Sequence, residues 1–415
     1  MTNEICQGLR VKRVYLILKQ LEKKMGSAQR NMEEVEDRGW NDPRTNVCQH
    51  CIGDLYLRRL VRKHLTEANC TYCKSKSRKA APTSVVMEAV MRAVKYSYND
   101  EASAGFPYDN EMSPDYLMSS YVLESVLDSQ DLDWPEKLKK DVANAFLNTG
   151  WIDAPDGEWM GAHPHERLHW SWDDFARAVK HQSRFHFQTR KRQRSCSDNL
   201  ISMHDMLPFL GSLIRRHRMV CTVSESSIFY RVRCGKHPHE IAELGARSDG
   251  KGTAGRMNPA GISYLYLAFD EKTALTETRT NPGDEATISQ WVASRYLSVI
   301  DLTRNLSCRS IFENEKREYE TVQFLWRFVD EISKPVERDG SEHIEYVPTQ
   351  VVSEYFAQAF RNAKDKHVDG LIYPSSVQPG GKNLVIFPAL DVQLSSQPVD
   401  RFQCVRLKSS GFYVV

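Results

Sequence analysis

The stretch that decides the fold of the second half of the chain is residues 255–277, GRMNPAGISYLYLAFDEKTALTE. Proline and glycine after Arg256 predict a turn. The following residues alternate as in a half-buried strand, with Tyr264 and Tyr266 on the face opposite the leucines. Asp270 is placed to cap a short helix whose second turn carries Glu277. One compact unit therefore presents an arginine, two tyrosines and a carboxylate.

These groups suit a ligand that carries phosphates and a flat ring. A guanidinium can hold a diphosphate in bidentate fashion, and a tyrosine can stack on a heterocycle. A carboxylate can stabilise a positive charge that develops on a sugar. The stretch therefore predicts a nucleotide site rather than an ordinary turn between strand and helix.

The same stretch resembles the RES family, which comprises NAD-consuming domains related to ADP-ribosyltransferases. Three further segments match the family in the expected order: FYRVR at 229–233, DGLIYPSS at 369–376 and GGKNLVIF at 380–387. The resemblance implies cleavage of NAD at the bond between nicotinamide and ribose. Water, phosphate or a protein side chain would be the acceptor, giving a glycohydrolase, a phosphorylase or a protein ADP-ribosyltransferase.

The resemblance also implies roles for individual residues. Glu277 would steady the ribose cation, and Ser375 would hydrogen-bond the ribose or the nicotinamide side. Arg256, together with Arg231, would hold the diphosphate. The tyrosines of the strand, Tyr266 and Tyr264, would pack on the nicotinamide. The set of residues expected to bind NAD is completed by Tyr230, Asn258 and Asn383.

Four of the ten cysteines have the spacing of a tetrathiolate zinc site. Cys48 and Cys51 form one C-x2-C pair, and Cys70 and Cys73 form the second after eighteen intervening residues. Each pair can supply two thiolates to a tetrahedral ion in a reducing compartment. We therefore expect a structural zinc ion, and we interpret the scattered remaining cysteines as small buried side chains.

Composition sets broad limits on the protein. The 415 residues predict two or three domains, and 41% hydrophobic with 27% charged residues argue against disorder throughout. A net charge of +2 is too small to identify a polyanionic partner, and it leaves nucleic-acid binding open. Apolar runs are too short to span a bilayer, and we expect a cytoplasmic protein. Partners implied by the family are NAD and an antitoxin or other regulatory protein, and self-association is left open.

The organisation predicted is an α+β multidomain chain. Residues 1–188 form a mostly helical domain with the zinc site, 189–199 a linker, and 200–415 a mixed α/β domain with a helical lead-in. The first part resembles the zinc-containing region, grouped with HEPN helical domains, that precedes some RES domains; this rests on the paired cysteines and HWSWDDF at 169–175. Helices are expected at 84–97, 121–128, 135–149, 200–218, 285–294 and 350–363, and strands at 228–233, 264–269, 297–302, 370–373 and 384–387.

Two other functions have a sequence signal. HERLH at 165–169 would place two histidines on one helix face, with Glu166 as the general base of a zinc peptidase. Gly161 and Pro164 stand where such a motif normally has an apolar helix, which favours a structural or regulatory cluster. Arg59 and His64 have the spacing of a HEPN-type RNase, but they lie on a charged face between the cysteine pairs.

Overall fold

The computed structural model describes residues 32–73, 79–100, 121–122, 127, 133–147, 150–154, 161–186, 201–247, 251–306, 310–313, 316–336, 340–389 and 401–415. The chain divides into two compact units. The first contains residues up to His163 and the segment 309–319, and the second contains Pro164–Cys308 and Glu320–Val415. Each unit has its own hydrophobic core and is described by itself.

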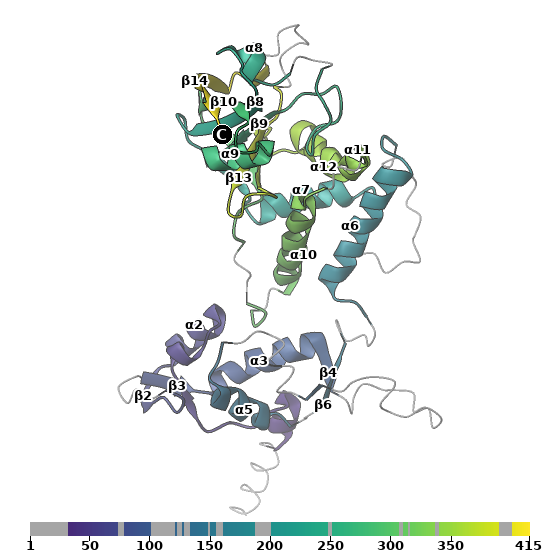
Figure 1. Cartoon of the computed structure of the whole chain (residues 1–415). Helices are drawn as coiled ribbons and strands as arrows, with labels where there is room; N and C mark the ends of the chain where they lie inside the picture. Colours follow the sequence, from purple (N-terminus) through teal and green to yellow (C-terminus); the bar gives the residue numbers. More distant parts are fainter. Residues whose placement is uncertain are drawn as a thin grey trace, which may run out of the picture. The chain divides into compact units, whose positions relative to one another are not determined.

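The second unit is built on an eight-stranded mixed sheet (Figure 1). Its strand order is β14-β10-β8-β9-β13-β12-β11-β7, and among these neighbours only β11 and β12 are parallel. The strands are β7 (Val220–Val223), β8 (Ile228–Cys234), β9 (Leu265–Ala268), β10 (Glu285–Ala293), β11 (Leu297–Asp301), β12 (Gly370–Pro374), β13 (Lys382–Ile386) and β14 (Val405–Val414).

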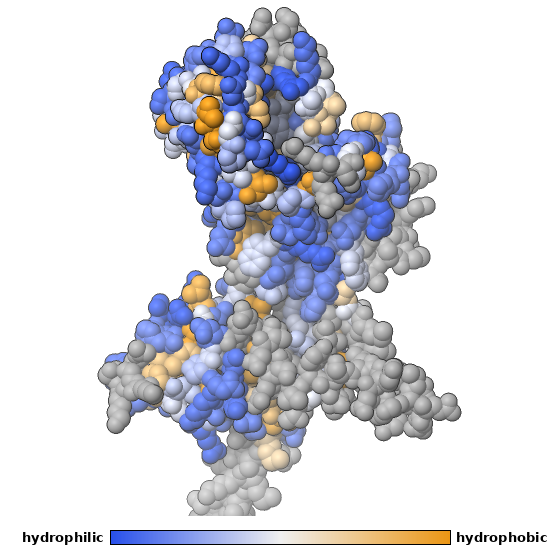
Figure 2. Space-filling view, viewed as in Figure 1, coloured by the Kyte–Doolittle hydropathy of each residue, from blue (hydrophilic) through white to orange (hydrophobic). Residues whose placement is uncertain are grey.

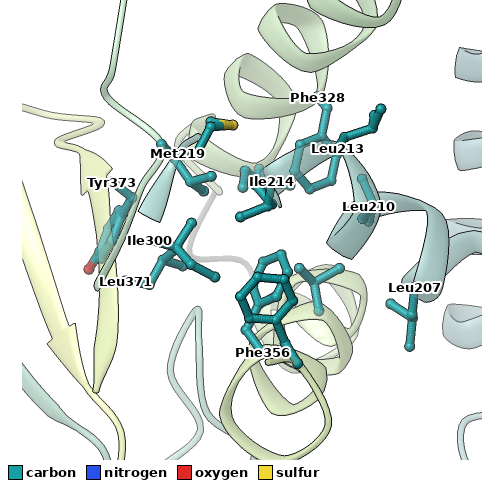
Figure 3. Packing of buried hydrophobic residues seen from close by; sticks show 14 of the residues in the cluster. Leu207, Leu210, Leu213, Ile214, Met219, Ile300, Phe328, Phe356, Leu371 and Tyr373 are labelled. Atoms are coloured by element: carbon teal, nitrogen blue, oxygen red, sulfur yellow. The ribbon is translucent and has the colours of Figure 1, made fainter. Parts of the chain in front are cut away.

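Most of the described helices gather by one part of this sheet, and the short helix α9 lies by another part. The helices are α6 (Pro164–His181), α7 (Met206–Arg216), α8 (Ile241–Leu244), α9 (Glu271–Thr278), α10 (Lys316–Ser333), α11 (Glu342–Glu345) and α12 (Val347–Gln358). In Figure 1, α6, α7, α10, α11 and α12 gather together, whereas α9 lies by β8, β9 and β13. The packing shown in Figure 3 joins α7, α10 and α12 to the sheet through Leu210, Leu213, Ile214, Ile300, Phe328, Phe356 and Leu371.

Helix α6 belongs to the core of this second unit. Leu168, Trp172, Phe175 and Val179 recur along one face of the helix and are buried in the same cluster as α10. The ring of Trp172 meets that of Phe328 edge-on, with centroids 4.8 Å apart. The expected linker at 189–199 lies outside the described residues.

The first unit combines helices with two small sheets. The helices are η1 (Gln49–Cys51), α2 (Leu55–Lys63), α3 (Ser84–Ser97) and α5 (Glu136–Ala145). One sheet has the order β1-β3-β2 and the other β4-β6-β5. Their strands are β1 (Asn46–Val47), β2 (Thr66–Asn69), β3 (Lys79–Pro82), β4 (Tyr98–Asp100), β5 (Tyr121–Val122) and β6 (Gly150–Asp153). The predicted helix at 84–97 is confirmed.

Most predicted elements of the second unit are confirmed, and one is wrong. The five strands expected from alternation are all present, with ends shifted by a few residues. The helix expected at 285–294 is instead β10, which pairs with β8 on one side and β14 on the other. Eight of its nine residues are at least partly buried because both faces of the sheet are covered there. Its pattern therefore lacks the alternation by which a strand is recognised. In the first unit, residues 121–122 form strand β5 rather than the start of a helix.

The surface of the second unit is mainly hydrophilic in the view of Figure 2, with apolar residues near the chain's C-terminal end. There the edge strand β14 exposes Phe412 and Val414. Among the helices that the structure describes, none is long and apolar enough to cross a membrane.

We predict that Phe356→Ala lowers the free energy of unfolding of the second unit by about 3–5 kcal/mol. Phe356 is fully buried and meets Phe360 edge-on, so truncation leaves a cavity between α12 and the sheet. Urea denaturation followed by circular dichroism measures the change. Phe185→Ala is the control, because Phe185 is 88% exposed and should cost under about 0.5 kcal/mol. Equal effects of the two substitutions would contradict this core.

Candidate functional site

A row of residues crosses four strands on one face of the sheet. Tyr230 of β8 is opposite Ala268 of β9, Ala268 is opposite Asn383 of β13, and Asn383 is opposite Tyr373 of β12. Residues directly opposite in antiparallel pairs point to the same face. A cavity of about 310 Å³ opens along this row, where α9 faces the sheet; its other walls include Arg231, Tyr266, Ala274, Glu277 and Thr278.

Glu277 enters this cavity from helix α9. The predicted cap is confirmed, since Oδ1 of Asp270 accepts the backbone N–H of Thr273 at 2.8 Å. At the other end of the helix, Oε1 of Glu277 accepts Oγ–H of Ser375 at 2.7 Å and Nδ2–H of Asn383 at 2.5 Å. The two donors fix the carboxylate in one orientation. Oε2 has no hydrogen-bond partner among the described residues, so one carboxylate oxygen stays available to a ligand.

The loop that carries Ser375 is locked against the start of α9. The Ser375 hydroxyl accepts a hydrogen bond from the backbone N–H of Gln378 at 3.0 Å, and the backbone N–H of Ser375 donates to the carbonyl of Gly381. A Cβ at Gly381 would lie 2.5 Å from Oγ1 of Thr273, so only glycine permits this approach. The serine loop and the helix of Glu277 are therefore held in register by direct contact.

Tyr266 lines the cavity with its ring while its hydroxyl is fixed elsewhere. The hydroxyl donates to Oδ1 of Asn258 at 2.6 Å and accepts the backbone N–H of Met257 at 3.0 Å. Burial raises the pKa of Tyr266, so the hydroxyl stays protonated. Asn258 is itself buried, and its Nδ2 donates to the carbonyls of residues 253, 259 and 262. Asn258, expected to bind NAD, is thus occupied in shaping the loop and holding Tyr266.

Arg231 lies where β8 and β9 diverge. The two strands pair at one register position, Tyr230 with Ala268, and Nη1 of Arg231 donates to the backbone carbonyl of Tyr266 at 2.8 Å. The guanidinium therefore supplies a donor to a carbonyl that faces the opening between the strands. Burial, followed by the nearby charge of Arg233, lowers the pKa of Arg231 to about 10, which leaves it charged at neutral pH.

The structure does not bring Arg256 and Tyr264 into this cavity. Nη1 of Arg256 donates to the carbonyl of Ile332 at 2.7 Å, and the guanidinium lies 5.5 Å from the ring centroid of Tyr346, in a different cavity of about 530 Å³. Tyr264 is in the core, where its ring meets Phe387 edge-on. The strand was predicted correctly, and Tyr264 and Tyr266 do lie on one face of it. That face is part core, at Tyr264, and part cavity wall, at Tyr266.

Tyr373 is the aromatic residue of the cavity that the sequence analysis did not single out. Tyr373 is buried at the end of β12, two residues before Ser375, and it lines the cavity beside Asn383. Burial raises its pKa well above the usual range for tyrosine. Tyr373 is at the end of the strand predicted at 370–373 and two residues before Ser375. Because side chains two residues apart on a strand point to the same face, this spacing could have identified it.

The four predicted metal ligands lie together in the first unit. Their Sγ atoms are within 4.8 Å of one another, with separations of 3.7 Å for Cys48–Cys51, 3.9 Å for Cys48–Cys73 and 3.8 Å for Cys51–Cys70. A tetrahedral zinc ion with Zn–S bonds of about 2.3 Å requires sulfur atoms about 3.8 Å apart. The N–H groups of Cys48 and Tyr72 point at Sγ of Cys70, as expected for a thiolate. The cluster therefore fits zinc in both chemistry and spacing.

The two histidines of HERLH have separate surroundings on α6. Nδ1 of His165 lies 2.6 Å from Oε2 of the buried Glu320. His169 is buried against the ring of Phe324, and among the described residues it joins no group of potential metal ligands. This favours a structural role for the motif over a peptidase. Arg59 and His64, the RNase candidates, are both exposed at α2, and their proposed role stays a prediction.

Two family models match the chain. One, described as HEPN/RES N-terminal domain 1, covers residues 63–193, and the other, the RES domain, covers residues 228–406. The chain carries a RES domain behind a HEPN/RES N-terminal domain. The RES match contains every residue that lines the cavity of Glu277, as well as Ser375. Comparison with curated proteins and with solved structures finds no match.

We predict that the purified full-length protein carries about one zinc ion per chain. A double variant with Cys48→Ser and Cys51→Ser should lose it and lose the fold of the first unit, because the ion joins two distant pairs of ligands. Elemental analysis and circular dichroism measure both effects. Cys221→Ser, at a cysteine of β7 outside the cluster, should retain the metal. Equal zinc content in the double variant and the wild type would contradict the site.

We also predict that His169 makes the second unit sensitive to acid. Burial, then the charges of Arg327 and His165, lowers the pKa of His169 from 6.5 to about 4. The stability that depends on neutral His169 is present above pH 6.5 and is lost as pH falls towards 4. Between pH 7.5 and pH 5 the wild type should lose about 2 kcal/mol more than His169→Leu in urea denaturation. An identical loss in both proteins would refute this.

Proposed function

We propose that the RES domain cleaves NAD at the bond between nicotinamide and ribose. The observation that carries this proposal is the carboxylate of Glu277, held through one oxygen by Ser375 and Asn383 in a cavity with tyrosine walls. These residues come from three separate segments of the RES match. A carboxylate fixed in this way can stabilise positive charge on a ribose without reorganising during the reaction.

The proposed reaction divides the work among the residues of the cavity. As the bond between C1′ and the pyridinium nitrogen breaks, its electron pair neutralises nicotinamide, and positive charge develops on the ribose. Glu277 stabilises that charge, and Ser375 keeps the carboxylate in place. The rings of Tyr266 and Tyr373 provide surfaces on which nicotinamide can pack. We assign the diphosphate to Arg231 rather than Arg256, because Arg231 lines this cavity and Arg256 lines another.

The acceptor completes the reaction by forming a bond from its nucleophilic atom, an oxygen in water or phosphate, to C1′ and releasing a proton. Water would give a glycohydrolase and phosphate a phosphorylase. A protein side chain, the alternative, would give an ADP-ribosyltransferase. We further propose that the N-terminal domain with the zinc site regulates the RES domain, either by restraining its activity or by sensing a signal. We also propose an antitoxin or other regulatory protein as a partner, as the RES resemblance implies.

Glu277→Gln in the full-length protein tests this function. Nicotinamide release from NAD should fall at least about a hundredfold, because the amide cannot stabilise the ribose cation while it keeps the shape of the side chain. The rate is measured by chromatography of nicotinamide. Ser375→Ala should reduce it about tenfold by freeing the carboxylate.

The matched control is Glu271→Gln, which removes an exposed carboxylate from the first turn of the same helix and should leave the rate unchanged. His165→Ala should also retain activity. Wild-type release of nicotinamide that persists in Glu277→Gln would contradict the assignment. Peptide cleavage that depends on His165, with NAD left intact, would favour the peptidase instead.

A further inference from the structure

The cavity of Arg256, about 530 Å³ in volume, has no part in the proposed reaction. It lies among α6, the end of α10, α11 and the start of α12, which gather together in Figure 1. Arg256 reaches it from the loop before β9. Trp172, Tyr346 and Pro348 give it apolar walls, and charged side chains of both signs complete the lining. Such a mixture is typical of a site for a small molecule.

The guanidinium of Arg256 is fixed in position, yet part of it is unused. Nη1 donates to the carbonyl of Ile332 at 2.7 Å, and the group lies 5.5 Å from the ring centroid of Tyr346. Nε and Nη2 have no hydrogen-bond partner among the described residues, and neither atom is enclosed by protein. Together they form the edge of a guanidinium that binds a carboxylate in bidentate fashion.

Two carboxylates line the same cavity close to each other. Glu331 is the residue before Ile332 on α10, and Asp173 lies on α6. Asp173 accepts no hydrogen bond from the described residues. Burial raises the pKa of Asp173, and burial followed by the charge of Asp173 raises the pKa of Glu331; Arg327 opposes both effects without cancelling them. A positive charge placed between the two carboxylates would therefore be stabilised.

The other charged side chains of the cavity already have partners. Nζ of Lys180 lies 2.6 Å from Glu345, and Nζ of Lys334 lies 3.5 Å from Asp330. Arg256 makes no ion pair with Asp173 or Glu331 among the residues that the structure describes. An unused cation and two half-buried anions thus face one cavity from separate walls.

We propose that this cavity binds a small molecule that has a carboxylate at one end and a cationic group at the other, of which the amino acid arginine is the simplest example. The carboxylate binds to Nε and Nη2 of Arg256. The cationic group lies between Asp173 and Glu331, where a planar guanidinium can pair with two carboxylates and pack on an aromatic ring. This site is separate from the one proposed for NAD.

One loop connects this cavity to the cavity of Glu277. The backbone carbonyl of Arg256 accepts the Thr349 hydroxyl, and the next N–H along the chain, that of Met257, donates to the Tyr266 hydroxyl. A ligand that fixes the Arg256 side chain therefore also stabilises the loop that holds Tyr266. Its effect on NAD cleavage rests on the proposed function, whereas the binding does not.

Ligand-detected NMR titration of the full-length protein with three probes tests the site. L-Arginine has both charged groups, agmatine lacks the carboxylate, and L-citrulline has a neutral group in place of the guanidinium. The wild type should bind L-arginine with a Kd of about 1 mM or lower. Agmatine and L-citrulline should each bind at least about tenfold more weakly, because each loses one charged contact.

Two variants assign the ends of the ligand. Asp173→Asn should weaken L-arginine binding about tenfold and leave L-citrulline binding unchanged. Arg256→Lys, which keeps the charge but loses the planar fork, should weaken L-arginine binding about tenfold and leave agmatine binding unchanged. Asp174→Asn is the matched control, because Asp174 is the next residue of α6, pairs with Arg177 and lies outside the cavity. If Arg256→Lys does not fold, Asp173→Asn decides alone.

Hydrogen exchange tests the connection to Tyr266. Saturating L-arginine should slow exchange of the backbone amides at residues 255–258 about fivefold in the wild type and leave it unchanged in Asp173→Asn at the same concentration. An exchange rate that L-arginine does not change in the wild type overturns the connection.

The site and the reaction fail separately. L-Arginine that binds the wild type and Asp173→Asn with equal affinity, or binds neither, overturns the site. Agmatine that binds as tightly as L-arginine overturns the pairing of a carboxylate with Arg256. NAD that displaces L-arginine assigns the cavity to the dinucleotide and overturns a separate ligand. L-Arginine binding that depends on Asp173, in a wild-type protein that releases no nicotinamide, supports the site and refutes the proposed cleavage.

Discussion

Two hydrogen bonds to one carboxylate oxygen connect the parts of the candidate site. Oε1 of Glu277 accepts from Ser375 and from Asn383, so helix α9, the serine loop and strand β13 share a single acceptor. This arrangement requires the strand register that places Asn383 beside Ala268 and Tyr373. It also requires glycine at 381, because any side chain there would push the serine loop away from α9. The sheet and its helix thus position the carboxylate before any ligand binds, which is the condition for effective electrostatic stabilisation.

The loop before β9 has a structural role that complements this one. Gln350 donates to the carbonyl of Gly255 and Thr349 to that of Arg256, so α12 holds the loop from one side. Asn258 then fixes the Tyr266 hydroxyl from within the loop. A Cβ at Gly255 would lie 2.6 Å from Oδ1 of Asn258 and 2.7 Å from the hydroxyl oxygen of Tyr266, so a larger residue there would disturb this hydrogen bond. The ring of Tyr266 therefore enters the cavity wall at a position determined by the larger helix cluster.

Local sequence signals predicted much of the second unit. The alternation around Tyr266 and the cap at Asp270 depend on neighbours a few residues away, and both were correct. The strand β10 was missed because it lies inside the sheet, between β8 and β14, and its side chains are buried on both faces of the sheet, which removes the alternation. The cysteine pairs could be recognised from spacing alone, since thiolate ligands of one ion must recur in short pairs.

Other features of the site depend on contacts between distant segments and could not be predicted. Arg256 was expected beside the ligand, but its partner is the carbonyl of Ile332, 76 residues away in sequence. Arg231 reaches the cavity because β8 and β9 diverge, and no local pattern announces where two strands separate. Tyr264 and Tyr266 share one face, yet only the helix cluster decides which of them is core.

The most direct test of the account is a crystal structure of the full-length Glu277→Gln variant with NAD bound. The account predicts that the ribose next to nicotinamide lies against residue 277, with the nicotinamide between Tyr266 and Tyr373 and the diphosphate at Arg231. NAD bound in the cavity of Arg256, with the cavity of residue 277 containing only solvent, would contradict the central claim.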